Sequence, residues 1–410
     1  MGRGEGRVVD ARTSATVTVD SESLDVSALM GYFDGTRAQS RDYQERLCAK
    51  AETMLDGTWT ARDGNRPVAA RSVLIESPTG SGKTVVALAL AQAAARRGKR
   101  IGWVAMRRNL LKQAAGMRDS LGFDVPNIRM ISMFDQDPPR DVDWLFVDEA
   151  QHDSTDSMAR IHGVIKPEKV IGLSATPYRT DRARLSFDRT IRDVGIHTLI
   201  AEGWLSQFDH FTVPKYGPAE VAGLFRAFPD RWGKSVAFFL TLDDCRAASA
   251  ALTEAGVTND IVWAGSDRDA QIDAFRAGGL QVLVSMSILS EGFDADDLQT
   301  VFVRPSSKLP GVQMCGRVLR LHEGTPVKQV VQCQSTHHPF VRTAPARTSY
   351  MLMDGEFRSL ARNERIDAIA RQTADLVLQA RVVLPNALMV KRGRGRRRRF
   401  GRDNPGDGTP

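Results

Sequence analysis

The chain has 410 residues, a formal charge of +7 and a hydrophobic fraction of 42%, which is typical of a protein with two or three globular domains. It contains no run of about 18 apolar residues, and its first residues form no apolar signal core, so a transmembrane helix and secretion are not expected. The four cysteines, at positions 48, 245, 315 and 333, form no C-x-x-C pair. This spacing argues against a disulfide framework and fits a reducing cytoplasm. Together with the lack of a long apolar run, it predicts a cytoplasmic protein without membrane contact.

The chain alternates short apolar runs with helical patterns, first over residues 71–200 and again over residues 235–332. Strands that alternate with helices in this way predict right-handed crossovers and a parallel sheet. We therefore expect an α/β protein with two tandem parallel-sheet domains. The expected strands are 72–75, 101–105, 128–131, 144–147 and 170–173 in the first domain, and 235–239, 260–263, 281–284, 300–303 and 327–332 in the second.

The remaining segments differ in composition. Residues 1–28 are polar and irregular, which indicates a flexible lead, and the first domain is expected over 29–203, starting with one or two helices within 28–55. The segment 204–233 is rich in proline and glycine and is interpreted as a connector, because these residues interrupt regular structure. The remaining boundaries are 204–345 for connector and second domain together, 346–390 for a helical extension, and 391–410 for a disordered basic tail.

The basic tail determines the sign of the net charge. Residues 391–402 hold eight Lys and Arg residues and no acidic residue, and without those eight cations the formal charge of the chain would be −1. A run of like charges with glycines and no apolar periodicity is typical of disorder. The charge of the tail indicates sequence-independent binding to the phosphates of a nucleic acid. The alternative is a solvated end that aids solubility.

Residues 77–84 read Ser-Pro-Thr-Gly-Ser-Gly-Lys-Thr and fit the phosphate-loop pattern G-x-x-x-x-G-K-[ST], with Ser77 in place of the first glycine. The segment follows an apolar run and opens a helical stretch, which is the context that the motif requires. Backbone N–H groups of such a loop surround phosphate oxygens at a helix N-terminus. Lys83 would neutralise the β- and γ-phosphates of ATP, and Thr84 would offer a hydroxyl to Mg²⁺. The expected nucleotide-binding residues here are Thr79, Gly80, Ser81, Gly82, Lys83 and Thr84.

The apolar run 144–147 ends in the paired carboxylates Asp148 and Glu149. In a parallel sheet the carboxyl end of such a strand lies at the same edge as the phosphate loop. Asp148 is therefore expected to hold Mg²⁺, mostly through water, and Glu149 to orient and deprotonate the attacking water. The predicted ligands are ATP and Mg²⁺.

Several segments resemble, in the right order, the motifs of superfamily 2 helicases and translocases. Asp148-Glu149-Ala150-Gln151 resembles their Asp-Glu-Ala-Asp/His box, with Gln151 as a departure in the last position. The pattern looks closer to the duplex-DNA group (XPB-like, type I restriction and phage repair helicases) than to the RNA-unwinding group. The other resemblances, within residues 40–335, are 41–44 with the R-x-Y-Q element, 104–113 with motif Ia, 172–177 with motif III, 235–239 with motif IV, 290–294 with motif V and 313–320 with motif VI.

The resemblance implies two RecA-like domains with ATP hydrolysis in the cleft between them. It implies that Gln44 reads the adenine and that Gly292 and Asp294 contact the nucleotide. Arg317 and Arg320 are three residues apart, so on a helix they would project from one face and reach the γ-phosphate as arginine fingers. The implied catalytic residues are Lys83, Glu149, Gln313, Arg317 and Arg320. The residues implied to couple hydrolysis to nucleic acid are Gln151, Ser174, Thr176 and Arg107.

The leading hypothesis is an ATP-dependent helicase or translocase that acts on nucleic acid, with DNA favoured over RNA. One alternative is a duplex-DNA translocase or remodeller that does not separate strands, and another is an RNA helicase. A third, outside the motors, is a P-loop small-molecule kinase or a plain nucleic-acid binder, against which motifs V and VI argue. The sequence does not identify a protein partner.

Overall fold

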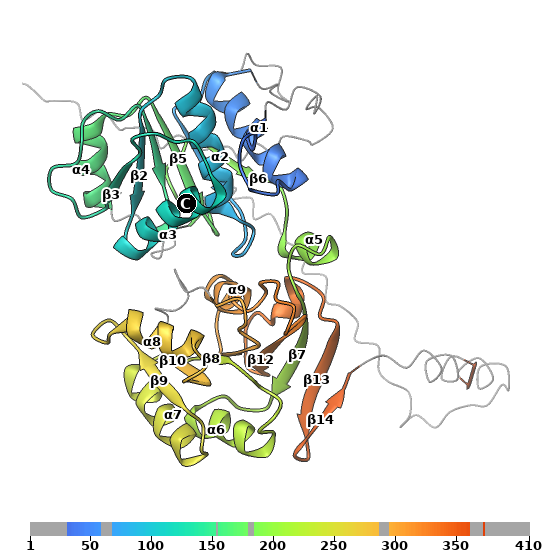
Figure 1. Cartoon of the computed structure of the whole chain (residues 1–410). Helices are drawn as coiled ribbons and strands as arrows, with labels where there is room; N and C mark the ends of the chain where they lie inside the picture. Colours follow the sequence, from blue (N-terminus) through green and yellow to red (C-terminus); the bar gives the residue numbers. More distant parts are fainter. Residues whose placement is uncertain are drawn as a thin grey trace, which may run out of the picture. The chain divides into compact units, whose positions relative to one another are not determined.

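The structure, a computed structural model, describes residues 31–58, 68–152, 155–178, 184–286, 295–360 and 372–373. The chain divides into one unit of residues 1–360 and a second of residues 361–410. The first unit contains two sheets (Figure 1). We call residues 31–201 the first lobe, residues 202–206 the linking segment and residues 207–360 the second lobe. The N-terminal lead, the basic tail and nearly all of segment 361–390 lie outside the described residues.

The first lobe is a six-stranded parallel sheet with the strand order β3-β2-β4-β5-β1-β6. Hydrophobic clusters on its two faces place α1, α2 and α3 on one side and α4 on the other (Figure 1). The elements are α1 (Asp42–Asp56), β1 (Ser72–Glu76), α2 (Lys83–Arg96), β2 (Ile101–Ala105), α3 (Arg108–Leu121), β3 (Arg129–Ser132), β4 (Trp144–Val147), a 3-10 turn (Ala150–His152), α4 (Thr155–Ile165), β5 (Lys169–Ser174), β6 (Arg189–Arg192) and α5 (Ile196–Ala201).

The second lobe is an eight-stranded sheet with the order β14-β13-β7-β12-β11-β8-β10-β9, parallel except for the antiparallel pair β13–β14. Helices α6 and α7 pack on one face, and α8 and α9 on the other (Figure 1). The elements are β7 (Gln207–Val213), α6 (Pro218–Ala227), β8 (Ser235–Phe238), α7 (Leu242–Glu254), β9 (Asn259–Val262), α8 (Arg268–Arg276), β10 (Val282–Ser285), β11 (Thr300–Val303), α9 (Lys308–Gly316), β12 (Val327–Cys333), a 3-10 turn (Phe340–Arg342), β13 (Thr348–Met353) and β14 (Glu356–Ser359).

Three neighbouring strands of the first sheet fix the position of the functional loops. β1 pairs with β5 so that Glu76 lies beside Ser174, and β4 pairs with β5 so that Val147 lies beside Gly172. All three strands are buried over most or all of their length, as expected for parallel strands covered on both faces. Because parallel strands end at one edge, the chain leaves β4, β5 and β1 at adjacent points.

The prediction of an α/β protein with two tandem parallel sheets is confirmed. All ten predicted strands are present, each with its ends within one residue of the expected position, and β6, β7, β13 and β14 are additional. The expected helical segment 28–55 contains α1, preceded over residues 31–41 by turns and irregular backbone. In the part of the chain that the structure describes, no helix is long and apolar enough to cross a membrane.

The interpretation of residues 204–233 as a connector is wrong. β7 lies inside the second sheet, between β13 and β12, and α6 packs against α7. The prolines and glycines mark the ends of these elements, since Pro214 follows β7 directly and Pro218 occupies the first turn of α6. Proline is favoured at that position because the first helical N–H groups have no partner within the helix.

The expected helical extension is wrong for residues 348–359, whereas residues 372–373 are helical. Residues 348–359 form the hairpin β13–β14, in which Met353 pairs with Glu356 across the two-residue turn Asp354-Gly355. Both turn residues have positive φ, 53° and 82°. Asp-Gly is favoured in such turns because its backbone twist matches that of the paired strands. The second sheet therefore extends beyond the predicted domain end at residue 345.

Helix α1 is tied to the end of β6 by a buried ion triad. The Asp193 carboxylate, directly after β6, lies 2.7 Å from Arg46 Nη2 and 2.5 Å from Lys50 Nζ. The side chains of Asp193 and Lys50 are both about 95% buried, with exposed fractions of 4% and 5%. Burial alone would raise the pKa of Asp193, but hydrogen bonds from Arg46 and Lys50 outweigh it and lower the pKa.

We predict that Asp193→Asn lowers the free energy of unfolding by about 3 kcal/mol, because the buried Lys50 loses its anionic partner. Chemical denaturation at pH 7 measures this loss. The matched control is Asp243→Asn, which removes a carboxylate that is 90% exposed and is expected to change stability by less than about 0.5 kcal/mol. Because the folded pKa of Asp193 is lowered, its contribution is present above pH ~4 and lost as pH falls through the folded pKa. Equal effects of both variants would contradict the prediction.

Candidate active site

The phosphate loop follows β1 and is held by its own hydrogen bonds. Ser77 N–H donates to the Ser174 carbonyl at 3.0 Å, which ties the start of the loop to β5. Ser77 Oγ donates to Ser81 Oγ at 2.7 Å, and Ser81 Oγ donates to the Pro78 carbonyl at 2.7 Å. Gly80 and Gly82 have φ values of 82° and 76°, the left-handed region that glycine adopts without strain. The loop is therefore preformed.

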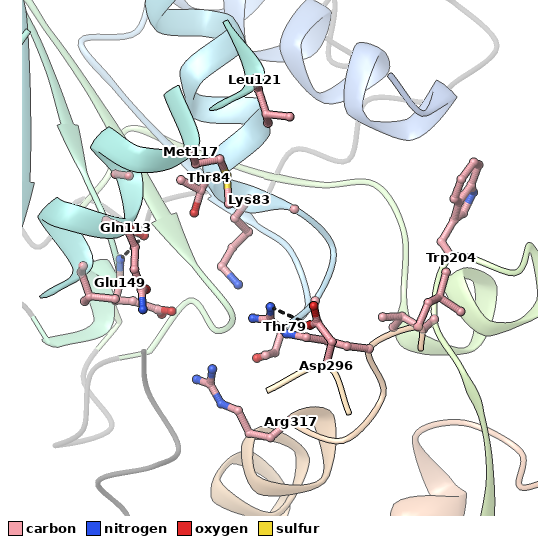
Figure 2. Close-up of a pocket in the computed structure, with 18 of the residues that line it drawn as sticks. Thr79, Lys83, Thr84, Gln113, Met117, Leu121, Glu149, Trp204, Asp296 and Arg317 are labelled. Atoms are coloured by element: carbon pink, nitrogen blue, oxygen red, sulfur yellow. Dashed lines mark hydrogen bonds and ion pairs between the residues drawn. The ribbon is translucent and has the colours of Figure 1, made fainter. Parts of the chain in front are cut away.

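Helix α2 begins at Lys83 with its N-cap position filled by Gly82, so no side chain caps its first N–H groups. Such a helix end is an anion site, since unpaired N–H groups and the helix dipole both favour negative charge. Burial lowers the pKa of Lys83, nearby Glu149 and Asp148 oppose this shift, and the cations of the second lobe add to it. Figure 2 shows the Lys83 ammonium pointing into the cavity toward Arg317.

This cavity measures about 640 Å³ and contains residues from both lobes and the linking segment (Figure 2). Most of the predicted nucleotide and catalytic residues lie on its wall. Those that do are Thr79, Gly80, Gly82, Lys83, Thr84, Asp148, Glu149, Arg317 and Arg320. Gln44, Ser81 and Gln313 do not line it, and Gly292 and Asp294 lie outside the described residues.

The two carboxylates follow β4 as expected. Burial raises the pKa of Asp148, the neighbouring Glu149 raises it further, and Lys83 opposes both effects. Glu149 has φ of 50°, an uncommon conformation for a residue with a side chain, and its N–H donates to Asp148 Oδ1 at 3.0 Å. Thr84 and Asp148 present a hydroxyl and a carboxylate to the cavity, the hard oxygen donors that suit Mg²⁺. The donor set therefore fits a Mg²⁺ ion bound by few protein ligands and by nucleotide phosphates.

A chain of hydrogen bonds links Glu149 to β5. Gln151 Nε2 donates to Glu149 Oε2 at 2.7 Å, and Ser174 Oγ lies 2.5 Å from Gln151 Oε1. Ser174 Oγ in turn accepts from Thr176 N–H at 3.1 Å. Gln151, Ser174 and Thr176 are all buried. The departure at Gln151 is therefore accommodated structurally, because an amide can donate to the carboxylate and accept from the hydroxyl at once.

Motif VI reaches the cavity in a different way from that expected. Helix α9 ends at Gly316, so Arg317 is the C-cap and Arg320 lies in the following turn. The two arginines therefore do not project from one helical face, although both line the cavity. The end of α9 lies close to the phosphate loop, since a Cβ added to Gly316 would lie 3.5 Å from Thr79 Cβ. Ser206 of the linking segment donates to the Arg320 carbonyl at 2.9 Å and fixes the turn.

Helix α1 supports the phosphate loop from behind. Tyr43 Oη donates to the Ser81 carbonyl at 2.6 Å, and Gln44 Nε2 reaches the same carbonyl at 3.2 Å. Both side chains are buried, and Gln44 Oε1 also accepts from Arg41 N–H. The amide of Gln44 is thus engaged with the protein, and its contact with adenine stays a prediction.

Two further cavity residues come from segments far apart in the chain, and no motif assigns either side chain a role in the site. The Arg41 guanidinium lies 4.7 Å from the centre of the Trp204 ring, and both side chains line the cavity. Arg41 precedes α1, whereas Trp204 belongs to the linking segment, which carries no motif. Arg107, the N-cap of α3, is partly buried and does not line the cavity, so its nucleic-acid role stays a prediction.

Comparison with known sequences identifies one family over part of the chain. The family described as type III restriction enzyme, res subunit, matches residues 37–128, which include the phosphate loop. A 51.5 kDa protein of a Lactococcus phage (isolate 7-9) is 22% identical over 269 residues, covering 58% of this chain. The chain spans about 60% of the length of that curated relative.

Comparison with solved structures concerns the fold. Two structures of S. cerevisiae Dbp5 bound to RNA and ADP BeF3, one of them a point variant, match with a TM-score of 0.52 and 14% identity. Each match covers 81% of this chain and 97% of the Dbp5 chain. The two lobes therefore have the RecA-like fold that the sequence predicted.

We predict that Tyr43→Phe weakens ATP binding about three- to tenfold, because a buried hydrogen bond contributes about 1 kcal/mol and this one holds the loop ready for phosphate. Titration of a fluorescent ATP analogue measures the affinity. The control is Tyr350→Phe, a tyrosine that stacks on Phe211 in the second lobe and does not line the cavity. Unchanged affinity in Tyr43→Phe would mean that the loop holds its shape without this bond.

Proposed function

We propose that the chain belongs to superfamily 2 of the helicases and translocases, that it hydrolyses ATP, and that it is a motor that moves along DNA. The observation that carries this proposal is the cavity wall, which combines the phosphate loop and two carboxylates of the first lobe with Arg317 and Arg320 of the second. A nucleotide in such a site would contact both lobes. Binding and hydrolysis would then change how firmly the lobes are held together, which is the mechanical step of a motor.

Each residue has a definite part in hydrolysis. The N-terminus of α2 and Lys83 bind the β- and γ-phosphates, and Glu149 accepts a proton from the attacking water. Asp148 and Thr84 would hold Mg²⁺, which would supply positive charge to the phosphate oxygens. Arg317 and Arg320 stabilise the charge that develops on the γ-phosphate as the bond to the leaving group breaks. Gln151 holds the Glu149 carboxylate in position through its hydrogen bond.

Gln151 and Ser174 also support the coupling of hydrolysis to movement. Loss of the γ-phosphate would shift Glu149, and the buried chain Glu149–Gln151–Ser174–Thr176 carries that shift to the loop after β5. Arg107, between β2 and α3, stands at the carboxyl edge of the same sheet and is proposed to contact the phosphates of the bound strand. Residues 391–402 are proposed to add phosphate contacts that carry no sequence information.

The preference for DNA is supported by the similarity to type III restriction res subunits over residues 37–128. The phage relative gives no substrate, and the Dbp5 likeness concerns the fold, so RNA remains the competing ligand. Translocation on a duplex without strand separation is the other competing reading.

We predict that Arg320→Ala lowers nucleic-acid-stimulated ATP turnover by about 10²-fold or more, since a cation supplied to the γ-phosphate acts mainly in the transition state. ATP affinity should change far less than turnover. Steady-state hydrolysis and fluorescence titration together measure both quantities. Arg246→Ala, which removes an exposed arginine of α7, serves as the control. Full stimulated turnover in Arg320→Ala would remove the second lobe from the catalytic site.

The DNA assignment predicts that duplex DNA stimulates turnover more strongly than RNA of the same length and sequence. Steady-state ATPase assays with duplex DNA, single-stranded DNA and RNA at one salt concentration test this, because phosphate contacts depend strongly on salt. Displacement of a triplex-forming strand without unwinding of a forked duplex would identify a translocase. Stimulation by RNA alone would contradict the DNA assignment.

A further inference from the structure

The guanidinium of Arg320 is engaged by a carboxylate of its own lobe. Arg320 Nη1 lies 3.6 Å from Asp296 Oδ1, and both residues line the cavity that holds Lys83 and Glu149 (Figure 2). The side chain of Asp296 is 62% exposed and that of Arg320 is 28% exposed. The contact is therefore open to the cavity, and a ligand that enters can reach it.

The backbone that carries Asp296 is fixed from behind by a buried lysine. Lys328 of β12 has no exposed surface, and its Nζ donates to the carbonyls of Asp296 and Leu298 at 2.8 Å each. A third bond joins it to Thr325 Oγ1 at 2.7 Å. Burial lowers the pKa of Lys328 to about 8, which the nearby Asp296 and Asp297 oppose. Two of these hydrogen bonds anchor the loop after the motif V segment.

The neighbouring Asp297 has a different partner. Its carboxylate forms an ion pair with Lys234, which also donates to the Arg276 carbonyl, and Asp297 does not line the cavity. The adjacent carboxylates of Asp296 and Asp297 therefore have different structural roles. Asp297 ties the loop to the segment before β8, and Asp296 faces the arginine of motif VI.

The cations that line the cavity explain why a carboxylate beside Arg320 affects nucleotide binding. Lys83, Arg317 and Arg320 line one cavity, and their like charges repel one another. The terminal phosphate of a nucleoside triphosphate would relieve this repulsion by accepting bonds from these cations. A carboxylate and a phosphate are both oxygen anions, so they compete for the same guanidinium.

We propose that Asp296 is a positioning residue that occupies Arg320 until the terminal phosphate of a nucleoside triphosphate replaces it. The inference relies on the proposed nucleotide site but not on movement along DNA. Asp296 opposes triphosphate binding, because the phosphate must displace the carboxylate before it gains Arg320. A nucleoside diphosphate has no terminal phosphate at this position, so its binding leaves the Asp296–Arg320 contact intact.

The test compares two nucleotides rather than two rates. Fluorescent analogues of ADP and of the non-hydrolysable triphosphate AMP-PNP are titrated with Mg²⁺ into the full chain, without nucleic acid. Asp296→Asn is expected to raise triphosphate affinity about two- to fivefold, the size of a partly exposed ion pair, and to leave ADP affinity unchanged. Asp296→Glu, which keeps the charge, should restore the selectivity of the wild type. The matched control is Asp297→Asn, which removes the same charge one residue away.

A double variant decides whether the effect passes through Arg320. In the Arg320→Ala background, Asp296→Asn should no longer change triphosphate affinity, because the competing partner is absent. A gain that persists without Arg320, an equal gain for ADP, or an equal gain in Asp297→Asn would overturn the proposal, as would failure of the wild type to bind either nucleotide. If nucleic acid fails to stimulate hydrolysis but the selective gain is seen, the motor function falls and this inference stands.

Discussion

The site depends on the parallel pairing of β4, β5 and β1. These three neighbours end at one edge of the first sheet, and each delivers a different chemical group there. β1 leads into the phosphate loop, β4 into Asp148 and Glu149, and β5 into Ser174. Because the register of a parallel sheet is fixed by buried apolar side chains, the separation between phosphate-binding and water-activating groups is set by the core. The hydrogen bonds between Ser77 and Ser174, and from Ser174 to Gln151, join the three loops into one unit.

The second constraint is electrostatic. Besides Arg41 and Arg276, the charged residues of the cavity wall are Lys83 and two carboxylates from the first lobe, and Arg317, Arg320 and Asp296 from the second. Lys83, Arg317, Arg320 and the carboxylates lie where the phosphates are proposed to bind. The net charge of the cavity therefore depends on whether a phosphate is bound there. Lys83, Asp148 and Arg317 are buried, so water screens their charges less. A triphosphate therefore interacts more strongly with the cations of this cavity than with an exposed basic surface. This fits the proposal that the nucleotide controls the contact between the two lobes.

The sequence was most informative where local pattern and chemistry coincide. Buried parallel strands form short apolar runs, and the ten runs seen in the sequence are strands in the structure. The sequence was misinterpreted where proline and glycine could mark either a loop or the end of a regular element. Proline and glycine in 204–233 suggested a connector, yet they end β7 and begin α6. The Asp354-Gly355 turn was a usable hairpin signal, but residues 346–390 were interpreted as a helical extension.

By itself, the sequence determined the two α/β units, the phosphate loop and the carboxylate pair, because each is encoded within a few consecutive residues whose spacing is dictated by backbone geometry. It also identified Arg317 and Arg320, but their spacing suggested a helical face, whereas α9 ends at Gly316 and a turn presents them. Only the tertiary structure decided which distant groups meet: Tyr43 beneath Ser81, Arg41 over Trp204, and Asp296 beside Arg320. Such contacts join segments that are distant in the chain or lie in different loops, and they follow from how whole elements pack, which no local pattern of residues specifies.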